Sequence, residues 1–422
     1  MAHMAGQAAF REEALDSIAA AAKRVSAAAV LGLGVGLAVA LAAMGFVAVL
    51  DWLNDRLLVA PYARARFIGS HATLALVTVA GPVLVGLLVG LLGSTLPHRR
   101  GLTPADAVLA AQTGEAPPKL RHSAVSTLAA LLSLGCGASV GQYGPLVWMG
   151  AAIGALSARM GIRGRDGRAI AIGCGVAAAI AAAFSAPIAG LVFAHEVVLR
   201  HYSMRAFAPV AIAAACGHVV ATTVFHRQPL FLVSFEHVRQ WWEYGLFGML
   251  GLFSAAVAWA LVSGVLGAGQ LAARLHAPSP VRPMLAGLGV GLMALALPET
   301  LGTGREVLRF ATIDEAFTAA ELAALMLAKI GLTALCLGFG FIGGVFSPAL
   351  LIGSLWGALF GMGAGLVSPV PLSGVEPYAI CGMMAVASAV IGAPLATILI
   401  VFELTRSYDL TIAAMVAVVL SN

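Results

Sequence analysis

Two pentads rich in glycine and proline, Gly141–Pro145 and Gly344–Pro348, constrain the fold more than any other feature of this sequence. They lie 203 residues apart (344 − 141), and the same spacing relates Gly154-Ala155-Leu156 to Gly357-Ala358-Leu359. Each pentad interrupts a long apolar stretch. A match of this kind over separate segments indicates an internal duplication.

Both pentads are expected to start a helix in the middle of a membrane. The first N–H groups of such a helix have no intrahelical partner, which is costly in lipid unless something buried satisfies them. An anion can do so, because free N–H groups and the helix dipole both favour negative charge. Interrupted segments at matching places in two repeats point to a transport site. The alternative is that these glycines and prolines serve close helix packing alone.

The composition predicts an all-α polytopic membrane protein. Of the 422 residues, 60% are hydrophobic and only 10% are charged, against about 25% charged in soluble domains. The net charge of +5 is small and scattered among loops, so we do not expect a nucleic-acid partner. We divide the chain into an N-terminal segment, a first membrane repeat and a second membrane repeat: 1–25, 26–235 and 236–422.

Basic residues set the expected orientation. They precede the first apolar span, 26–50, and follow the second, about 72–96, at His98-Arg99-Arg100. Cytoplasmic loops of membrane proteins carry an excess of lysine and arginine. By this rule, the start of the first span and the end of the second both face the cytoplasm. We therefore expect a cytoplasmic N-terminus.

Patterns typical of enzymes are weak here. Gly137–Gly141 spells G-x-S-x-G, but that motif needs a strand before a helix, and the chain offers no sheet. His195-Glu196 has no second ligand at helical spacing, so no metal site is expected. The five cysteines lie in apolar stretches without a C-x-x-C pair, and we expect buried thiols and no cofactor.

Two glutamates end apolar helices at matching positions of the duplication. Glu196 follows Ala186-Pro187, and Glu403 follows Ala393-Pro394 at an offset of 207 (403 − 196). A carboxylate within a membrane span is a functional candidate by default. The alternative is that each glutamate makes a structural contact, with Arg200 and Arg406 as possible partners. We favour this alternative because both repeats carry the glutamate.

The chain resembles the CLC chloride channel/transporter family over nearly its whole length. Gly141-Gln142-Tyr143-Gly144-Pro145 corresponds to the family's G-[KR]-E-G-P, and Gly344–Pro348 to its G-x-F-x-P. Further matches are Ala183–Gly190 (A-F-N-A-P-L-A-G), Pro298–Gly302 (P-x-x-x-G) and Gly392–Thr405 (R-A-P-L-T…F-E-x-T). The resemblance implies inverted-topology repeats with broken, tilted helices, a central anion site, and a homodimer with one pathway per subunit. Because the sequence shows no regulatory soluble domain, the chain resembles the prokaryotic members of the family. This resemblance implies that the protein lies in the bacterial inner membrane.

Departures from the family pattern bear on mechanism. The gating glutamate, third in the first pentad, is Tyr143, which stays neutral at pH 7. The internal proton-transfer glutamate of the family's antiporters, just after the carboxylate that matches Glu196, is Val197. The anion-binding serine falls at Gly101, with Thr103 a possible substitute. The family's anion-binding tyrosine would follow Asn422, and whether it is lost stays open.

These observations predict a passive chloride channel. A coupled chloride/proton antiporter or a fluoride exporter is the alternative, and a membrane enzyme or scaffold is disfavoured. Tyr143 is the expected gate, acting by bulk or by donating its O–H. The expected anion-binding residues are Gly101, Gly141, Gln142, Tyr143, Gly144, Gly344, Val345, Phe346 and Ser347.

Overall fold

The computed structural model describes residues 2–56, 71–113, 120–161, 165–226, 237–275, 277–313 and 316–422, which are almost entirely helical. In the first half, the helices are α1 (Ala2–Arg56), α3 (His71–Ser94), α4 (Pro104–Thr113), α5 (Leu120–Gly135), α6 (Tyr143–Gly161), α7 (Arg165–Phe184), α8 (Pro187–Phe193) and α9 (Met204–Val219). A 3₁₀ turn at Pro97–Arg99 and π-helical turns at Ala194–Leu199 and Val220–Val224 complete this half.

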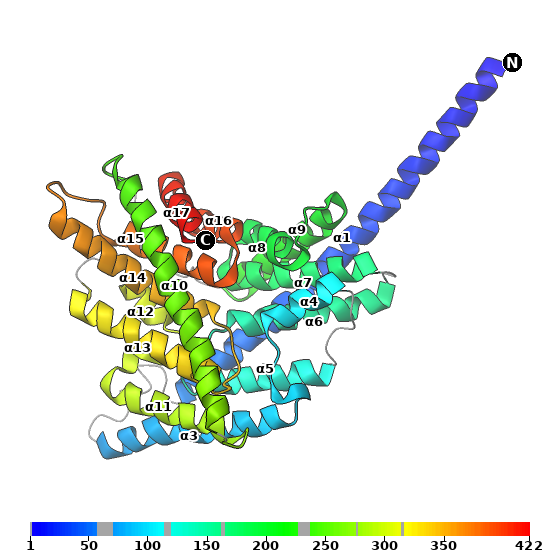
Figure 1. Ribbon diagram of the computed structural model, residues 1–422. Helices are drawn as coiled ribbons and strands as arrows, with labels where there is room; N and C mark the ends of the chain where they lie inside the picture. Colours follow the sequence, from blue (N-terminus) through cyan, green and yellow to red (C-terminus); the bar gives the residue numbers. More distant parts are fainter. Residues whose placement is uncertain are drawn as a thin grey trace.

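The second half repeats this plan. Its helices are α10 (Glu243–Arg274), α11 (Val281–Ala296), α12 (Arg305–Phe310), α13 (Ala319–Gly338), α14 (Phe346–Val367), α15 (Val375–Ile391), α16 (Pro394–Thr405) and α17 (Tyr408–Ser421), with a 3₁₀ turn at Pro298–Thr300. The predicted all-α fold class is confirmed for the described residues, whose helices lie tilted relative to one another (Figure 1).

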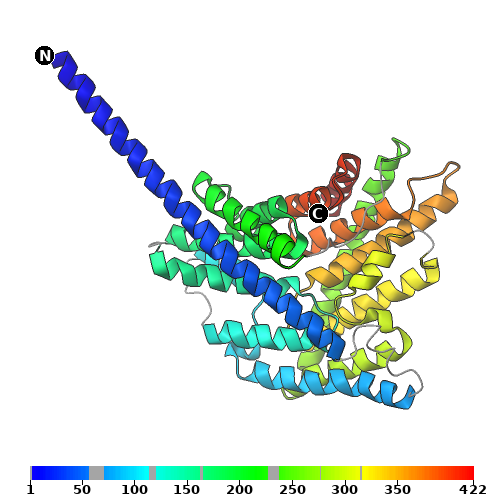
Figure 2. The ribbon, with the colours of Figure 1, turned by 180° about the vertical axis from the view of Figure 1, so that it is seen from behind.

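Seven helices in the described part of the chain are long and apolar enough to cross a membrane. One of them, α1, runs without interruption from Ala2 to Arg56, so no break in the helix marks the expected boundary between 1–25 and the first repeat. Figure 2 shows α1 crossing the back of the molecule and extending well beyond it at its N-terminal end.

The breaks fall where glycine and proline predicted them. α8 and α16 each begin with a proline at the first helical position, where a missing N–H costs nothing. The residues just before these starts, Ser185 (φ 57°) and Gly392 (φ 67°), are left-handed and turn the chain. Each short helix can therefore follow a long one within the same apolar block.

Glu196 and Glu403 join the two repeats reciprocally. Glu196 accepts the N–H groups of Leu395 and Ala396 at the start of α16, both at 2.9 Å. Glu403 accepts those of Ile188 and Ala189 at the start of α8, at 2.9 and 2.7 Å. Each carboxylate thus caps the short helix of the other repeat, where a helix start favours negative charge.

This finding confirms the structural reading of both glutamates and corrects their partners. Neither Arg200 nor Arg406 forms an ion pair with them among the described residues. Arg200 and Arg406 instead follow the last residue of each helical segment, where their backbones adopt the left-handed conformation, with φ of 57° and 53°. The partners were missed because they lie about 200 residues away in sequence, in the other repeat.

Candidate functional site

The two pentads meet at the centre of the molecule, as predicted. Gly141 and Gly344 form an isolated antiparallel bridge, in which each N–H donates to the other's carbonyl, at 2.6 and 2.8 Å. Glycine is needed for this approach, because a Cβ on Gly144 would lie 2.8 Å from Gly344 Cα. The antiparallel sense also fits repeats of opposite orientation.

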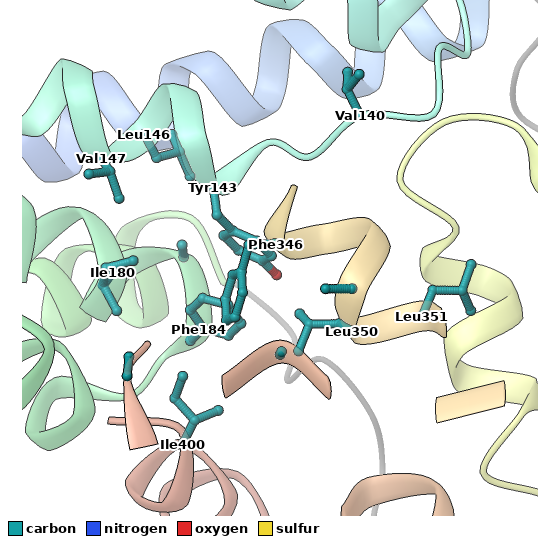
Figure 3. Packing of buried hydrophobic residues seen from close by; sticks show 14 of the residues in the cluster. Val140, Tyr143, Leu146, Val147, Ile180, Phe184, Phe346, Leu350, Leu351 and Ile400 are labelled. Atoms are coloured by element: carbon teal, nitrogen blue, oxygen red, sulfur yellow. The ribbon is translucent and has the colours of Figure 1, made fainter. Parts of the chain in front are cut away.

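Three aromatic rings gather beside this bridge (Figure 3). Tyr143 stacks on Phe184, with ring centroids 4.1 Å apart, and Phe346 meets both rings edge-on at 5.4 and 5.5 Å. All three side chains are buried. Tyr143 and Phe346 are the first residues of α6 and α14, so the cluster lies where the two broken helices begin.

The backbone donors of the pentads are not all free, which corrects part of the sequence prediction. The amides of Gly141 and Gly344 are used in the bridge, and the N–H of Gln142 donates to the Ser347 hydroxyl at 3.2 Å. By contrast, the N–H groups of Tyr143 and Phe346 have no backbone acceptor among the described residues. Helix starts of this kind are suited to an anion.

A cavity of about 820 Å³ leads to these helix starts. Six of the nine expected anion-binding residues line it: Gly101, Tyr143, Gly144, Gly344, Val345 and Phe346. The other three, Gly141, Gln142 and Ser347, do not line it. Two members of the aromatic cluster, Tyr143 and Phe346, thus form part of the cavity wall.

The mouth of the cavity is basic. Its lining includes Arg99, Arg100, Arg200 and Arg282, and no aspartate or glutamate of the described ranges is among the lining residues. Arg100 is paired in a bidentate manner with Asp106, at 2.7 and 3.0 Å. A concave surface with charges of one sign raises the local concentration of the opposite ion. The arrangement therefore attracts small anions.

Gly101 and Thr103 both line the cavity but differ in whether they can offer a side-chain donor to an anion. Gly101 packs so closely on Ile342 that a Cβ there would lie 2.7 Å from the isoleucine side chain. The Thr103 hydroxyl donates to Asp106 at 2.9 Å, and the Thr103 N–H donates to the same oxygen at 2.7 Å. The Thr103 hydroxyl is thus already bound to Asp106 and does not substitute as a free donor.

Val197 also lines the cavity, within the π-helical turn Ala194–Leu199. The adjacent Glu196 is bound to the start of α16 and does not line the cavity. Among the lining residues, therefore, no carboxylate is available to carry a proton. No group of three or more potential metal ligands occurs in the described chain.

Comparison with known proteins places this arrangement in a family. The family profile described as "Voltage gated chloride channel" matches residues 85–422. The chain belongs to the voltage-gated chloride channel family. It is 32% identical over 352 residues to a putative ClcB-like chloride channel protein of Ralstonia nicotianae, covering 81% of this chain and 80% of that protein.

Other relatives and solved structures agree on the family and the fold. The H⁺/Cl⁻ exchange transporter ClcA of Vibrio cholerae is 31% identical over 289 residues, covering 66% of this chain and 61% of the transporter. A slow cyanobacterial Cl⁻/H⁺ antiporter superimposes with a TM-score of 0.84 at 21% identity, covering 93% of both chains. A CLC-type fluoride/proton antiporter gives 0.78 at 20%, covering 94% of both. The protein is accordingly an integral membrane protein of a family that transports anions.

Sequence reasoning missed three features around this site. Phe184 is the stacking partner of Tyr143, a contact that its motif, Ala183–Gly190, does not indicate. Lys329 is fully buried in α13, where its Nζ donates to the carbonyls of Thr300 and Gly302 at 2.8 and 2.6 Å. A lone cation within an apolar span was a usable signal for Lys329. The third feature is the ion pair of Arg305 with Asp51, at 3.9 Å, which no signal in the sequence indicated.

Proposed function

We propose that this protein is a passive anion channel for chloride that conducts without proton coupling and without a cofactor. The observation that carries the proposal is Tyr143, which stands at the meeting point of the two broken helices, in the wall of the cavity. A carboxylate at this place can alternate between anion and acid, whereas a phenol, with a reference pKa of about 10, does not ionise near neutral pH. Tyr143 can therefore obstruct the path or donate one hydrogen bond, but it cannot cycle protons.

The lack of an inner proton carrier supports the same proposal. Val197 stands in the cavity wall where a glutamate would be needed, and the adjacent carboxylate in sequence, Glu196, is occupied by two backbone amides. A chloride ion would be held by the free amides at the starts of α6 and α14. Conduction requires that such binding be strong enough to admit the ion and weak enough to release it.

We place the basic cavity on the cytoplasmic side of the bacterial inner membrane. The positions of the basic residues, including Arg99 and Arg100, favour a cytoplasmic N-terminus and a cytoplasmic end of α3. On this view, the four arginines draw chloride from the cytoplasm toward Gly101 and Tyr143. Cleavage of a protease site inserted before α1 in inverted membrane vesicles, but not in intact cells, would support this orientation.

We further propose a homodimer in lipid, with one pathway in each subunit. In support, α8, α9, α16 and α17 lie together in the fold (Figure 1). These helices expose large apolar side chains. Examples are Ile188, Phe207, Leu395 and Met415, each 45–50% exposed. Light scattering of the detergent-solubilised protein should give twice the chain mass of 42.8 kDa after correction for detergent. A monomer mass would contradict this part of the proposal.

Proteoliposomes test the proposed transport directly. With a chloride gradient imposed and external pH recorded, we expect chloride efflux once a potassium ionophore dissipates the membrane potential, and no uphill movement of protons. A known H⁺/Cl⁻ exchange transporter in parallel vesicles is the positive control. Chloride-driven proton movement would establish antiport instead, and flux confined to fluoride would establish a fluoride exporter.

A further inference from the structure

Phe184 belongs to the cluster of three rings but does not line the cavity. Its buried ring stacks on Tyr143, whereas Tyr143 and Phe346 both form part of the cavity wall. Figure 3 shows the three side chains gathered at one point. Tyr143 therefore has an aromatic partner on one side and borders an open space of about 820 Å³ on another. This space gives the Tyr143 ring room to turn when it leaves Phe184.

Phe184 offers a fixed surface for this stack. It is the last residue of α7, and every residue from 171 to 184 is buried. The chain then turns at Ser185, with φ 57°, directly into α8, whose start is held by Glu403 of the other repeat. Tyr143, by contrast, begins α6, and the first N–H groups of a helix have no intrahelical partner. Of the two rings, Tyr143 is thus the one whose surroundings allow a change of position.

The duplication shows that this stack belongs to one repeat only. Tyr143 matches Phe346 at the offset of 203 (346 − 143), and each is the first residue of a broken helix. Phe184 matches Ile391 at the offset of 207 (391 − 184), and each ends the long helix before a short capped one. Ile391 has no ring to stack, and it lines the cavity. The second repeat therefore has no counterpart of the Phe184 stack.

The rings close the space between the two helix starts and are not needed to join them. Gly141 and Gly344 already hold the two backbones together through their paired hydrogen bonds. All three rings are buried, and an apolar constriction of this kind excludes water and ions. An ion that enters from the cavity can therefore pass only when a ring is displaced.

We propose that Phe184 is the latch of the Tyr143 gate: the path is shut while the two rings are stacked, and it opens when the Tyr143 ring turns away into the cavity. Phe184 is a positioning residue, because it acts through Tyr143 and not on the anion. One aromatic pair favours the stacked state by about 2- to 12-fold. This inference rests on the proposed conduction past Tyr143, and it assigns the residue that sets how often the path is open.

Single-channel recording of Phe184→Leu in planar bilayers tests the latch. We expect the open fraction to rise about 2- to 12-fold, while the unitary current stays at the parental value, because Phe184 does not touch the ion. Phe184→Met, which is closer to the parent in length, should change the open fraction in the same direction. Phe247→Leu is the matched control. Phe247 is also buried and stacks on Tyr378, with centroids 4.6 Å apart and planes inclined by 25°, and neither ring lines the cavity. Its loss should leave the open fraction unchanged.

A double-mutant cycle separates a latch from a general loosening of the fold. In a Tyr143→Leu background, Phe184→Leu should cause no further rise, because no ring is left to release. Additive effects in this cycle, an unchanged open fraction in both Phe184 variants, or an altered unitary current would overturn the latch. If the parent moves chloride only in exchange for protons, the proposed function fails, and the same cycle measured as transport rate still decides the latch.

Thiol accessibility tests the latch without any ion flux. Ser347 is the second residue of α14 and does not line the cavity. In a Cys216→Ser background, where the other four cysteines are buried, Ser347→Cys should react slowly with an impermeant thiol reagent added on the cavity side. Adding Phe184→Leu should speed this reaction several-fold, and adding Phe247→Leu should not. Equal rates with and without Phe184→Leu would overturn the latch. A parent protein that conducts no chloride would refute the proposed function and leave this test decisive.

Discussion

The ring of Tyr143 is stacked on that of Phe184, with the centroids 4.1 Å apart and the planes inclined by 19°. Phe346 of the other repeat meets Tyr143 edge-on, so the phenol is held between side chains from both halves of the duplication. Aromatic pairs of this kind contribute about 0.5–1.5 kcal/mol each beyond burial. Tyr143 is thus a fixed part of the wall, and its rotation costs the loss of this stacking.

Shortening Tyr143 should open the path. Tyr143→Ala removes the ring from the meeting point of α6 and α14, and we expect a several-fold rise in chloride efflux from proteoliposomes. If the hydroxyl matters more than the bulk, Tyr143→Phe should instead change the order of anion permeation with little change in flux. Tyr408→Ala, an exposed tyrosine at the start of α17, is the control for the substitution itself. Parental flux and selectivity in both Tyr143 variants would remove this residue from the pathway.

A carboxylate at position 143 should create a pH-sensitive gate. Tyr143→Glu places an anion at helix starts that favour negative charge, so it should block the path at neutral pH. Flux should rise as the pH falls and the glutamate is neutralised. Tight proton coupling should not appear, because Val197 still offers no inner carrier. Measuring chloride efflux from pH 4 to pH 8 with simultaneous proton recording checks both points; pH-independent flux would contradict the first.

Removing a reciprocal cap should affect stability and leave the ion pathway intact. Glu403→Ala leaves the amides of Ile188 and Ala189 without their acceptor, and each unsatisfied amide costs about 1–3 kcal/mol. We expect a clearly lower melting temperature in detergent, and uncoupled chloride flux in the protein that remains folded. Glu196→Ala should behave alike, and the exposed Glu299→Ala serves as the control. Unchanged melting temperatures would contradict the capping role.

Asp106 at the cavity mouth should show a defined pH dependence. Burial alone would raise the pKa of its carboxyl, but hydrogen bonds from Arg100 and Thr103 outweigh burial and hold that pKa below its usual value. A lowered folded-state pKa contributes stability above the ordinary carboxyl pKa of about 4, and the contribution is lost as the pH falls through the folded-state value. Asp106→Asn should therefore lower the melting temperature at pH 7, and the difference from the parent should shrink as the pH falls below the ordinary carboxyl pKa of about 4. A difference that stays constant as the pH is lowered through this range would contradict this assignment.

Much of the fold was accessible from the sequence, because glycine and proline act locally. Gly141–Pro145 and Gly344–Pro348 marked the helix breaks, and their spacing revealed the duplication that brings Gly141 and Gly344 into one bridge. Apolar stretches of sufficient length marked the spans. These features depend on neighbouring residues or on the repeat itself, and both can be read along the chain.

Other parts of the site depend on contacts that the sequence does not encode locally. Glu196 binds amides about 200 residues away, and only the inverted packing of the repeats reveals them. Thr103 offers a free hydroxyl in the sequence pattern, whereas in the fold this hydroxyl donates a hydrogen bond to Asp106, three residues later. The central role of Tyr143 was predicted, but its neighbours were not.

The reversal potential under a proton gradient tests the central claim most directly. The purified protein is reconstituted in a planar bilayer with a tenfold chloride gradient, and the pH of one side is changed by two units. A channel without proton coupling predicts a reversal potential of about 59 mV in magnitude, the chloride equilibrium value at 25 °C, at every pH difference. A reversal potential that moves with the pH difference in a fixed ratio would show that protons are exchanged for chloride, and would contradict the account.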